Sequence, residues 1–260
     1  MRRSKIVLTT AVLLATAAHG GTAQAASDGE PLTSVISAIK RQFAKKSSVH
    51  VSIKTREDFS GAKSTADTHG VYRFTRSGVF ASDSTEIDKD PVSPGRFRMI
   101  NIGRDSYTQS TDYSLLPKGK KWTHWRNADG FLWAKDLIDG LNPAFLTHVA
   151  SRQVVRSAGG TVDGVNTTLY SGTVTVPELG TRQAGTTFDL KEGRAAGGQV
   201  KWKLWAGPDS LPRRFHAAIS FEPVGEEKKG WSIVANMLYK QWGHSVKITA
   251  PPKNLTVEAG

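Results

Sequence analysis

Cysteine is absent from the sequence. Its absence excludes disulfide frameworks, thiolate zinc sites, iron–sulfur clusters, a cysteine nucleophile and lipid attachment through cysteine. Aromatic residues make up only 8% of the 260 positions, while 38% are hydrophobic and 22% are charged. This balance is too apolar for a disordered chain and too polar for a bundle of membrane spans. The length suits one large β-rich domain or two small ones.

The apolar run at the N-terminus is far shorter than the ~20 residues that cross a bilayer. Three cations within the first five residues precede this run, which spans residues 6–14, and a small-x-small motif follows at 23–25. Together these features are typical of a signal peptide. We therefore expect residues 1–25 to be removed by cleavage near Ala25 rather than retained as a membrane anchor. The mature protein is expected to be secreted, extracellular or loosely associated with the cell envelope.

Acidic residues are outnumbered by basic ones, 23 to 35, which gives a formal net charge of +12. Removal of a signal peptide with three cations and no acids leaves +9. The densest basic and aromatic cluster lies at 118–126, and its candidate contact residues for an anionic surface are Lys118, Lys120, Lys121, Trp125 and Arg126. Such a cluster suits an anionic membrane or wall polymer, or it is a solvated strand end with inward tryptophans. Nucleic acid is not an expected partner, because the other cations form separate pairs and the protein is exported.

The mature chain is predicted to be a flexible lead-in, residues 26–31, followed by a single domain, residues 32–260. Apolar side chains recur at helical spacing over 31–46, which predicts an amphipathic helix. The apolar period then changes to two, which predicts strands. Strands are expected at 49–54, 68–75, 78–87, 96–102, 106–111, 154–155, 166–176, 199–206, 213–222, 231–240 and 245–249. Residues 118–126 are expected to be a strand or a loop. Two helical patches interrupt them, at 131–141 and, after an Asn-Pro start signal, at 144–150.

Two of the predicted strands show most clearly that the sheet has one apolar face. Val200, Trp202 and Leu204 alternate with more polar neighbours, and residues 213–222 repeat the pattern. We predict an α+β fold in which a curved antiparallel sheet of about ten strands is plugged on its concave side by the first helix and residues 131–150. Periodicity does not distinguish a filled interior from a hollow one.

Catalytic motifs are lacking. The histidines are scattered singly along the chain, at His19, His50, His69, His124, His148, His216 and His244. The sequence contains no H-E-x-x-H, G-x-S-x-G, P-loop or G-x-G-x-x-G motif. A triad assembled in space stays open, but we expect a monomer that is not an enzyme and has no cofactor or metal.

Five short motifs resemble one known family. They are residues 48–52 (SVHVS), 119–122 (GKKW), 163–172 (DGVNTTLYSG), 211–215 (LPRRF) and 239–243 (YKQWG) continuing into 246–252 (VKITAPP). In this order they are similar to motifs of the actinobacterial LolA-like lipoproteins of the LppX/LprG type. The resemblance covers residues 32–257, nearly all of the mature chain.

This resemblance implies an incomplete antiparallel barrel wrapped around helices and enclosing an apolar cavity. It also implies a role in carrying the acyl chains of lipids or lipoproteins outside the cytoplasmic membrane. The sequence departs from many of these relatives because it has no lipobox cysteine to anchor it. Related domains also serve as sensors that contact envelope proteins, so a fold of this kind does not settle the role.

We therefore expect a non-catalytic carrier or binder of a lipid or other hydrophobic ligand, held between sheet and helices. The alternative is an envelope interaction or sensor domain with a filled core and no ligand. Periodicity selects the candidate lining residues, which are Ile36, Ile39, Phe43, Leu137, Leu141, Phe145, Trp202, Leu204, Phe215 and Ile219.

Overall fold

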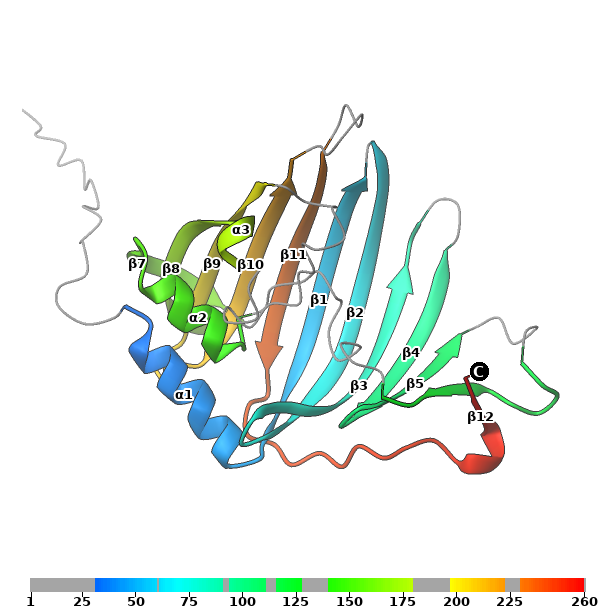
Figure 1. Cartoon of the computed structure of the whole chain (residues 1–260). Helices are drawn as coiled ribbons and strands as arrows, with labels where there is room; N and C mark the ends of the chain where they lie inside the picture. Colours follow the sequence, from blue (N-terminus) through cyan, green and yellow to red (C-terminus); the bar gives the residue numbers. More distant parts are fainter. Residues whose placement is uncertain are drawn as a thin grey trace, which may run out of the picture.

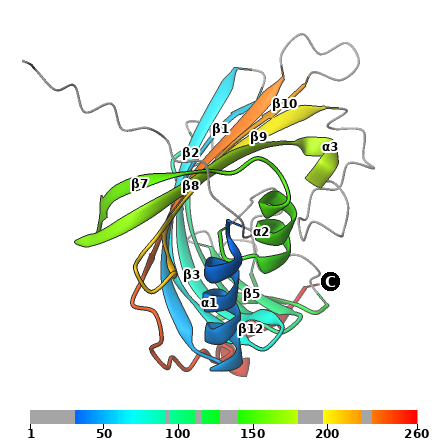
Figure 2. The ribbon, with the colours of Figure 1, turned by 90° about the vertical axis from the view of Figure 1, so that its left-hand side faces the viewer.

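The computed structural model describes residues 31–59, 61–90, 94–110, 116–127, 140–179, 197–222 and 230–259. The expected signal peptide and residues 26–30 of the lead-in lie outside these ranges. The described residues form one curved sheet of twelve strands, with helices gathered on one of its faces (Figure 1, Figure 2).

Three α-helices occur in the described part of the chain: α1 (Thr33–Ala44), α2 (Pro143–Ala150) and α3 (Val176–Leu179). Helix α1 falls within the predicted range and buries the apolar stripe that predicted it. Helix α2 begins as expected, because the Asn142 side chain accepts hydrogen bonds from the backbone N–H groups of Ala144 and Phe145, at 3.0 and 3.3 Å. Of the other predicted helical patch, residues 131–139 lie outside the described residues.

Ten of the twelve described strands lie where strands were predicted, and the predicted number was about ten. Strand β7 was predicted only at 154–155, and β12 was not predicted. The strands are β1 (Ser48–Phe59), β2 (Ala62–Thr75), β3 (Gly78–Asp88), β4 (Gly95–Ile102), β5 (Asp105–Ser110), β6 (Trp122–Trp125), β7 (Val155–Val162), β8 (Val165–Thr175), β9 (Gly198–Ala206), β10 (Pro212–Phe221), β11 (Trp231–Lys240) and β12 (Thr256–Glu258).

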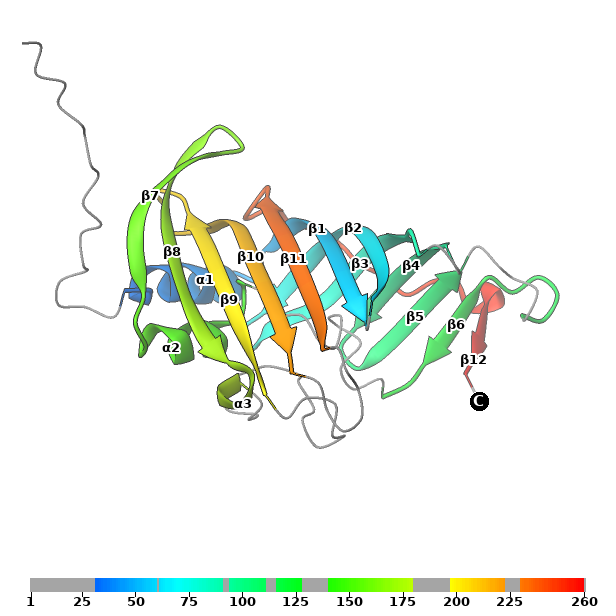
Figure 3. The ribbon, with the colours of Figure 1, turned by 90° about the horizontal axis from the view of Figure 1, so that it is seen from above.

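The sheet is curved but not closed. Its strand order is β12-β6-β5-β4-β3-β2-β1-β11-β10-β9-β8-β7, so β12 and β7 are its two edges (Figure 3). All neighbouring strands are antiparallel except β12 and β6. The prediction of a curved antiparallel sheet in an α+β chain is confirmed to this extent.

The predicted strand at 245–249 is wrong. Residues 244–252 have no regular secondary structure, and the last strand of the described chain is β12 instead. The alternation that suggested a strand is real, since Val246 and Ile248 pack on one side against a second, smaller hydrophobic cluster. The backbone, however, runs past the sheet without pairing to it (Figure 1). Alternation reports which side of a chain is buried, and burial does not require ladder hydrogen bonds.

The two faces of the sheet are covered differently along its width. We call the face toward α1 and α2 the inner face and the opposite one the outer face. The main hydrophobic cluster lies between the helices and the inner face of β1, β2 and β8–β11. The smaller cluster joins Ala81, Ile100 and Trp122 to Ile248 on the outer face of β3–β6. The C-terminal segment therefore covers the face that the helices do not.

Candidate functional site

Nine of the ten predicted lining residues meet in one place. Helix α1 contributes three of them, α2 one, the turn before α2 one, and strands β9 and β10 four. They are Ile36, Ile39, Phe43, Leu141, Phe145, Trp202, Leu204, Phe215 and Ile219, all buried in the main cluster. The tenth, Leu137, lies outside the described residues. Periodicity thus selected side chains that share one face between helices and sheet.

Aromatic rings pack closely at the centre of this group. The Phe145 ring stands edge-on to the rings of Trp202 and Phe215, with centroids 6.3 and 6.0 Å apart. The Tyr239 hydroxyl oxygen accepts a hydrogen bond from the Gly140 N–H at 3.1 Å and lies 3.3 Å from the Met237 sulfur. This part of the inner face is apolar, and its buried hydroxyl has hydrogen-bond partners.

The inner face continues beyond the helices onto β3–β6, where its character changes. Strand pairing places Tyr72, Ser82, Asn101, Ser106 and Trp125 opposite one another in one row across five strands. Directly opposed residues of antiparallel strands share a face, so this row lies on the inner face with Tyr72 of the main cluster. We call these five residues the cross-strand row. Sequence reasoning missed it, because isolated serines in a strand resemble solvent-facing positions.

The three central residues of the cross-strand row are polar and almost completely buried. Their exposed fractions are 1% for Ser82, 3% for Asn101 and 1% for Ser106. The Asn101 side-chain amide donates to Ser82 Oγ at 2.9 Å. Asn101 Oδ1 and Ser106 Oγ have no hydrogen-bond partner among the described residues. Buried polar atoms are nearly always paired in native proteins, so two neighbouring exceptions require an explanation.

Large hydrophobic side chains are exposed beside the cross-strand row. Trp125, at its end, is 41% exposed, and its indole N–H donates to Thr108 at 3.2 Å. Phe97 on β4 is 37% exposed and lies on the same face as Asn101, four residues further along the strand. The inner face therefore passes from a closed apolar cluster to a polar row with aromatic side chains at its margin.

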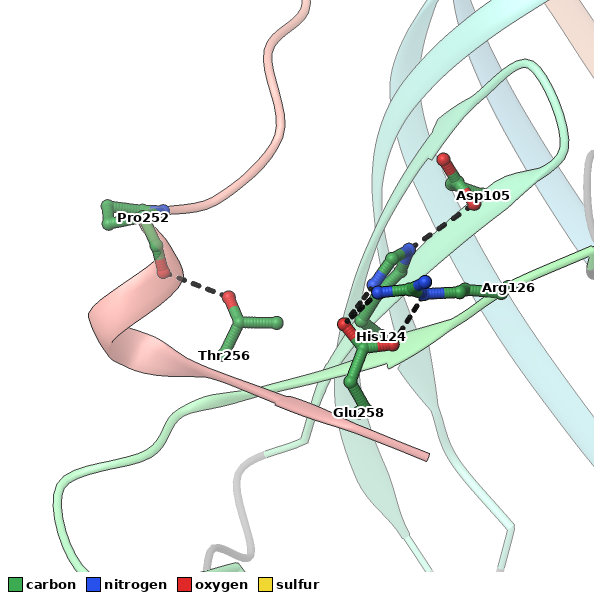
Figure 4. A network of polar contacts seen from close by, with 6 residues as sticks. All are labelled: Asp105, His124, Arg126, Pro252, Thr256 and Glu258. Carbon is green, nitrogen blue, oxygen red and sulfur yellow. Dashed lines mark hydrogen bonds and ion pairs between the residues drawn. The ribbon is translucent and has the colours of Figure 1, made fainter. Parts of the chain in front are cut away.

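The predicted basic cluster lies at the other end of the sheet from α2, around β6. Lys118 and Lys121 are exposed, whereas Lys120 Nζ donates to the backbone carbonyl of Asn254 at 3.1 Å. Arg126 is exposed and forms a double contact with Glu258, at 3.0 and 3.1 Å (Figure 4). Part of the cluster thus fastens the C-terminal segment.

The carboxylate of Glu258 holds β12 against β6. Glu258 on β12 accepts hydrogen bonds from Arg126 and from His124 Nδ1, the latter at 3.0 Å, and His124 Nε2 lies 3.3 Å from Asp105 (Figure 4). The Arg126 hydrogen bonds, followed by the one from His124, lower the pKa of Glu258 from 4.5 to about 2. The carboxylate therefore stays ionised down to strongly acidic pH.

A broader set of cations lies on the outer face of β1, β2 and β9–β11. Its members alternate with the buried residues of these strands and point away from the helices: Lys54, Arg56, Lys63, Arg73, Lys201, Lys203, Arg214 and Lys240. Two carboxylates, Asp58 and Asp67, share this face of the same strands. We call these cations the outer basic face. The period-two alternation of Lys201 and Lys203 was its signal in the sequence.

The described ranges contain neither a metal-binding cluster nor a membrane-spanning helix. No group of three or more His, Asp or Glu side chains there is arranged to hold a metal ion. None of the helices in those ranges combines the length and apolarity that a membrane span needs.

Comparison with known proteins gives structural likenesses only. No family model matches the sequence, and no curated protein matches it. Among solved structures, the chain is similar to LprF from Mycobacterium bovis, with 14% identity, a TM-score of 0.45, and coverage of 84% of this chain and 95% of that one. LprF is of the LppX/LprG family, which is the family that the sequence motifs resemble.

Two further likenesses are weaker. The MucA/MucB complex of Pseudomonas aeruginosa gives 14% identity, a TM-score of 0.31, and coverage of 85% of this chain and 59% of that one. A DUF1329 family protein from Desulfovibrio piger gives 12% identity, a TM-score of 0.29, and coverage of 85% and 96%.

Proposed function

We propose that this protein is an exported, non-catalytic binder or carrier of a lipid or other hydrophobic molecule, with a LolA/LppX-like incomplete barrel wrapped around its helices. The observation that carries the proposal is the division of the inner face. One part is closed by α1 and α2 over an apolar cluster, and the adjoining part of β3–β6 presents exposed Phe97 and Trp125. An acyl chain bound at this margin would contact the exposed side chains of Phe97 and Trp125.

Burial of apolar surface alone supplies the free energy for such binding. Transfer of an acyl chain from water to an apolar surface is favourable by ~0.8 kcal/mol for each buried methylene. The exposed aromatic side chains would also lose contact with water when a ligand covers them. A chain of about ten buried methylenes would thus gain about 8 kcal/mol before the entropy cost of association.

The net positive charge of the protein would attract it to an anionic surface that contains its ligand. A net charge of +9 after removal of the signal peptide favours an anionic membrane or wall surface. We assign this contact to the outer basic face together with the exposed part of the predicted cluster, Lys118 and Lys121. Since the outer face points away from the helices, the protein could lie on such a surface with its inner face unobstructed.

The competing function is an envelope interaction or sensor domain with a filled core. It is favoured by the close edge-on packing of Phe145 against Trp202 and Phe215, because those rings occupy the space between α2 and the sheet. In that case the exposed side chains of β3–β6 would contact a protein instead of a lipid.

Titration with the fluorescent fatty acid cis-parinaric acid separates the two functions. We expect saturable binding to the wild type and a loss of affinity of about tenfold in Phe97→Ser, because a large apolar contact is removed. Ile87→Ser is the matched control, since Ile87 is 40% exposed on the opposite face of the neighbouring strand. Absence of binding by the wild type would favour the filled-core domain, and equal losses in both variants would remove the inner face as the site.

A further inference from the structure

On the outer face of the sheet, one side chain fixes the positions of two others. Asn236 on β11 lies directly opposite His216 on β10. The Asn236 side-chain oxygen lies 3.0 Å from Arg214 Nη2 and 3.0 Å from His216 Nδ1. The Arg214 guanidinium also lies over the Trp205 ring, 4.8 Å from its centroid. Arg214 and His216 are therefore held side by side on the surface of the sheet, each half-buried.

This geometry determines which nitrogen of His216 carries the hydrogen. A guanidinium only donates, so the Asn236 atom beside Arg214 is the amide oxygen. Because the same oxygen faces His216 Nδ1, that nitrogen is a donor and keeps its hydrogen. Nε2, which has no hydrogen-bond partner among the described residues, is the nitrogen that gains or loses a proton. Protonation therefore adds a charge and an outward N–H donor without breaking the contact with Asn236.

Three lysines surround this pair. Lys203 on β9 lies directly opposite His216, and Lys201 is its diagonal neighbour on the same strand. Lys54 on β1 lies opposite Asn236. All three lysines are exposed, and within the described chain none of them forms an ion pair with a carboxylate.

Counter-charges are distant from this cluster of cations. No aspartate or glutamate occupies an outer position of β8–β11 over the described lengths of these strands. The carboxylates of the outer face, Asp58 and Asp67, lie on β1 and β2, and they contact Lys63 at 4.0 Å and Lys89 at 2.6 Å. The positive charge around Arg214 is thus not neutralised by the described residues, and a proton on the neighbouring imidazole increases the repulsion. An anion bound there would relieve it.

We propose that Lys203, Arg214 and His216 bind a phosphate group of an anionic phospholipid, and that the attachment is tightest when His216 is protonated. A guanidinium offers two parallel donors that match phosphate oxygens, and the ammonium and imidazolium groups each add a donor. This assignment rests on the anionic-surface contact proposed above, and it names the chemical group that is bound and the regulation of the contact by pH.

Apolar side chains between the cations favour a phospholipid surface over a wall polymer. Leu238 lies directly opposite Arg214, and Val234 lies opposite Arg56. Both are half-buried at outer positions of β11. The interface of a bilayer presents phosphate groups next to apolar chains, so cations and apolar side chains can contact it together. A phosphodiester polymer presents phosphate and hydroxyl groups only.

The pH dependence of vesicle binding tests the role of His216. Histidine changes its charge between about pH 5 and 8, whereas the phosphodiester of phosphatidylglycerol stays ionised. In cosedimentation with vesicles of phosphatidylcholine and phosphatidylglycerol, we expect wild-type affinity to rise about tenfold from about pH 7.5 to 5.5, and that of His216→Gln about twofold. His69→Gln is the matched control, because His69 is exposed on the same face and contacts Ser52 at 3.0 Å. It should keep most of the rise. Equal losses in the two variants would assign the pH dependence to total charge and overturn the site.

Asn236→Leu tests the geometry without changing the charge. Arg214 and His216 lose their common acceptor, so the affinity for the same vesicles at about pH 5.5 should fall about fivefold. Ser232→Ala, on the same strand and face, should leave it unchanged. Unchanged binding by Asn236→Leu would overturn the assignment. In the unmodified protein, ¹⁵N chemical shifts should show neutral His216 with its hydrogen on Nδ1, and a hydrogen on Nε2 instead would overturn it as well.

Soluble poly(glycerol phosphate) distinguishes the two sources of phosphate. We expect it to displace the protein from the vesicles only weakly. Binding of this polymer together with failure to bind the vesicles would assign the site to a wall polymer and overturn the phospholipid. A wild type that binds neither at low salt would end both this assignment and the proposed surface contact, while the titration with parinaric acid tests the hydrophobic ligand separately.

Discussion

Phe145 packs helix α2 against the sheet. It is completely buried, and its ring contacts those of Trp202 and Phe215. Phe145→Ala should therefore lower the free energy of unfolding by about 3–5 kcal/mol, the usual cost of removing a buried phenylalanine ring. Urea denaturation measures this change.

Val155→Ala supplies the comparison for that measurement. Val155 is 46% exposed on the edge strand β7, so the substitution should change the free energy of unfolding by less than about 0.5 kcal/mol. A loss for Phe145→Ala as small as this would mean that the ring borders open space, and the close packing inferred between α2 and the sheet would be wrong.

Individual residues also show what the sequence could and could not predict. Apolar periodicity located Ile39, Phe145 and Phe215 correctly in one cluster, because burial on one face is what periodicity records. It could not identify Ser82, Asn101 and Ser106 as neighbours, because the pairing register of β3, β4 and β5 brings them together. Register joins residues that are distant in sequence, and no local pattern encodes it.

At the scale of elements, the C-terminal strand β12 shows the same limit. Its three residues have no extended alternation, and the parallel pairing with β6 is held by Glu258 between Arg126 and His124. Residues 245–249, which do alternate, lie along the sheet without pairing. Helix α1 was predictable to within two residues at each end because its apolar stripe and its boundaries are both local.

The attachment of β12 should depend on pH in a defined direction. Because the folded pKa of Glu258, about 2, is below its ordinary value of 4.5, its stabilising contribution is complete above pH 4.5 and is lost as pH falls toward 2. The amide resonance of Ala259, whose N–H donates to His124 O at 2.8 Å, should move with a midpoint near pH 2.

Glu258→Gln is the control for this titration, because it removes the carboxylate and keeps the side-chain shape. In the variant, the acid transition of the Ala259 resonance should disappear. A midpoint near 4.5 in the wild type would show that Arg126 and His124 do not hold the carboxylate in solution.

On the scale of the whole molecule, the distribution of charge predicts how the protein meets a surface. Binding to phosphatidylglycerol vesicles should be strong at low salt and lost at about 1 M salt, where the Debye length is only about 3 Å. Each cation close to such a surface contributes about 1 kcal/mol. The double variant Lys201→Glu, Lys203→Glu on the outer basic face should therefore weaken binding strongly.

The matched pair for this test is Lys118→Glu, Lys121→Glu, which makes the same change of charge beside β6. We expect it to weaken vesicle binding less, because Lys118 and Lys121 have few other unpaired cations around them in the described chain, whereas Lys201 and Lys203 lie among the cations of the outer basic face. Equal effects of the two pairs would mean that net charge, and not the outer basic face, determines the contact. Cosedimentation with the vesicles measures both.

The central claim, that the inner face holds a hydrophobic ligand, is tested most directly by native mass spectrometry of the protein purified from its producing cells without detergent. We predict a population heavier than the unliganded protein by the mass of a lipid, which organic extraction converts to the unliganded mass and which incubation with lipid restores. A single mass equal to that of the unliganded protein, unchanged after incubation with lipid, would contradict the account.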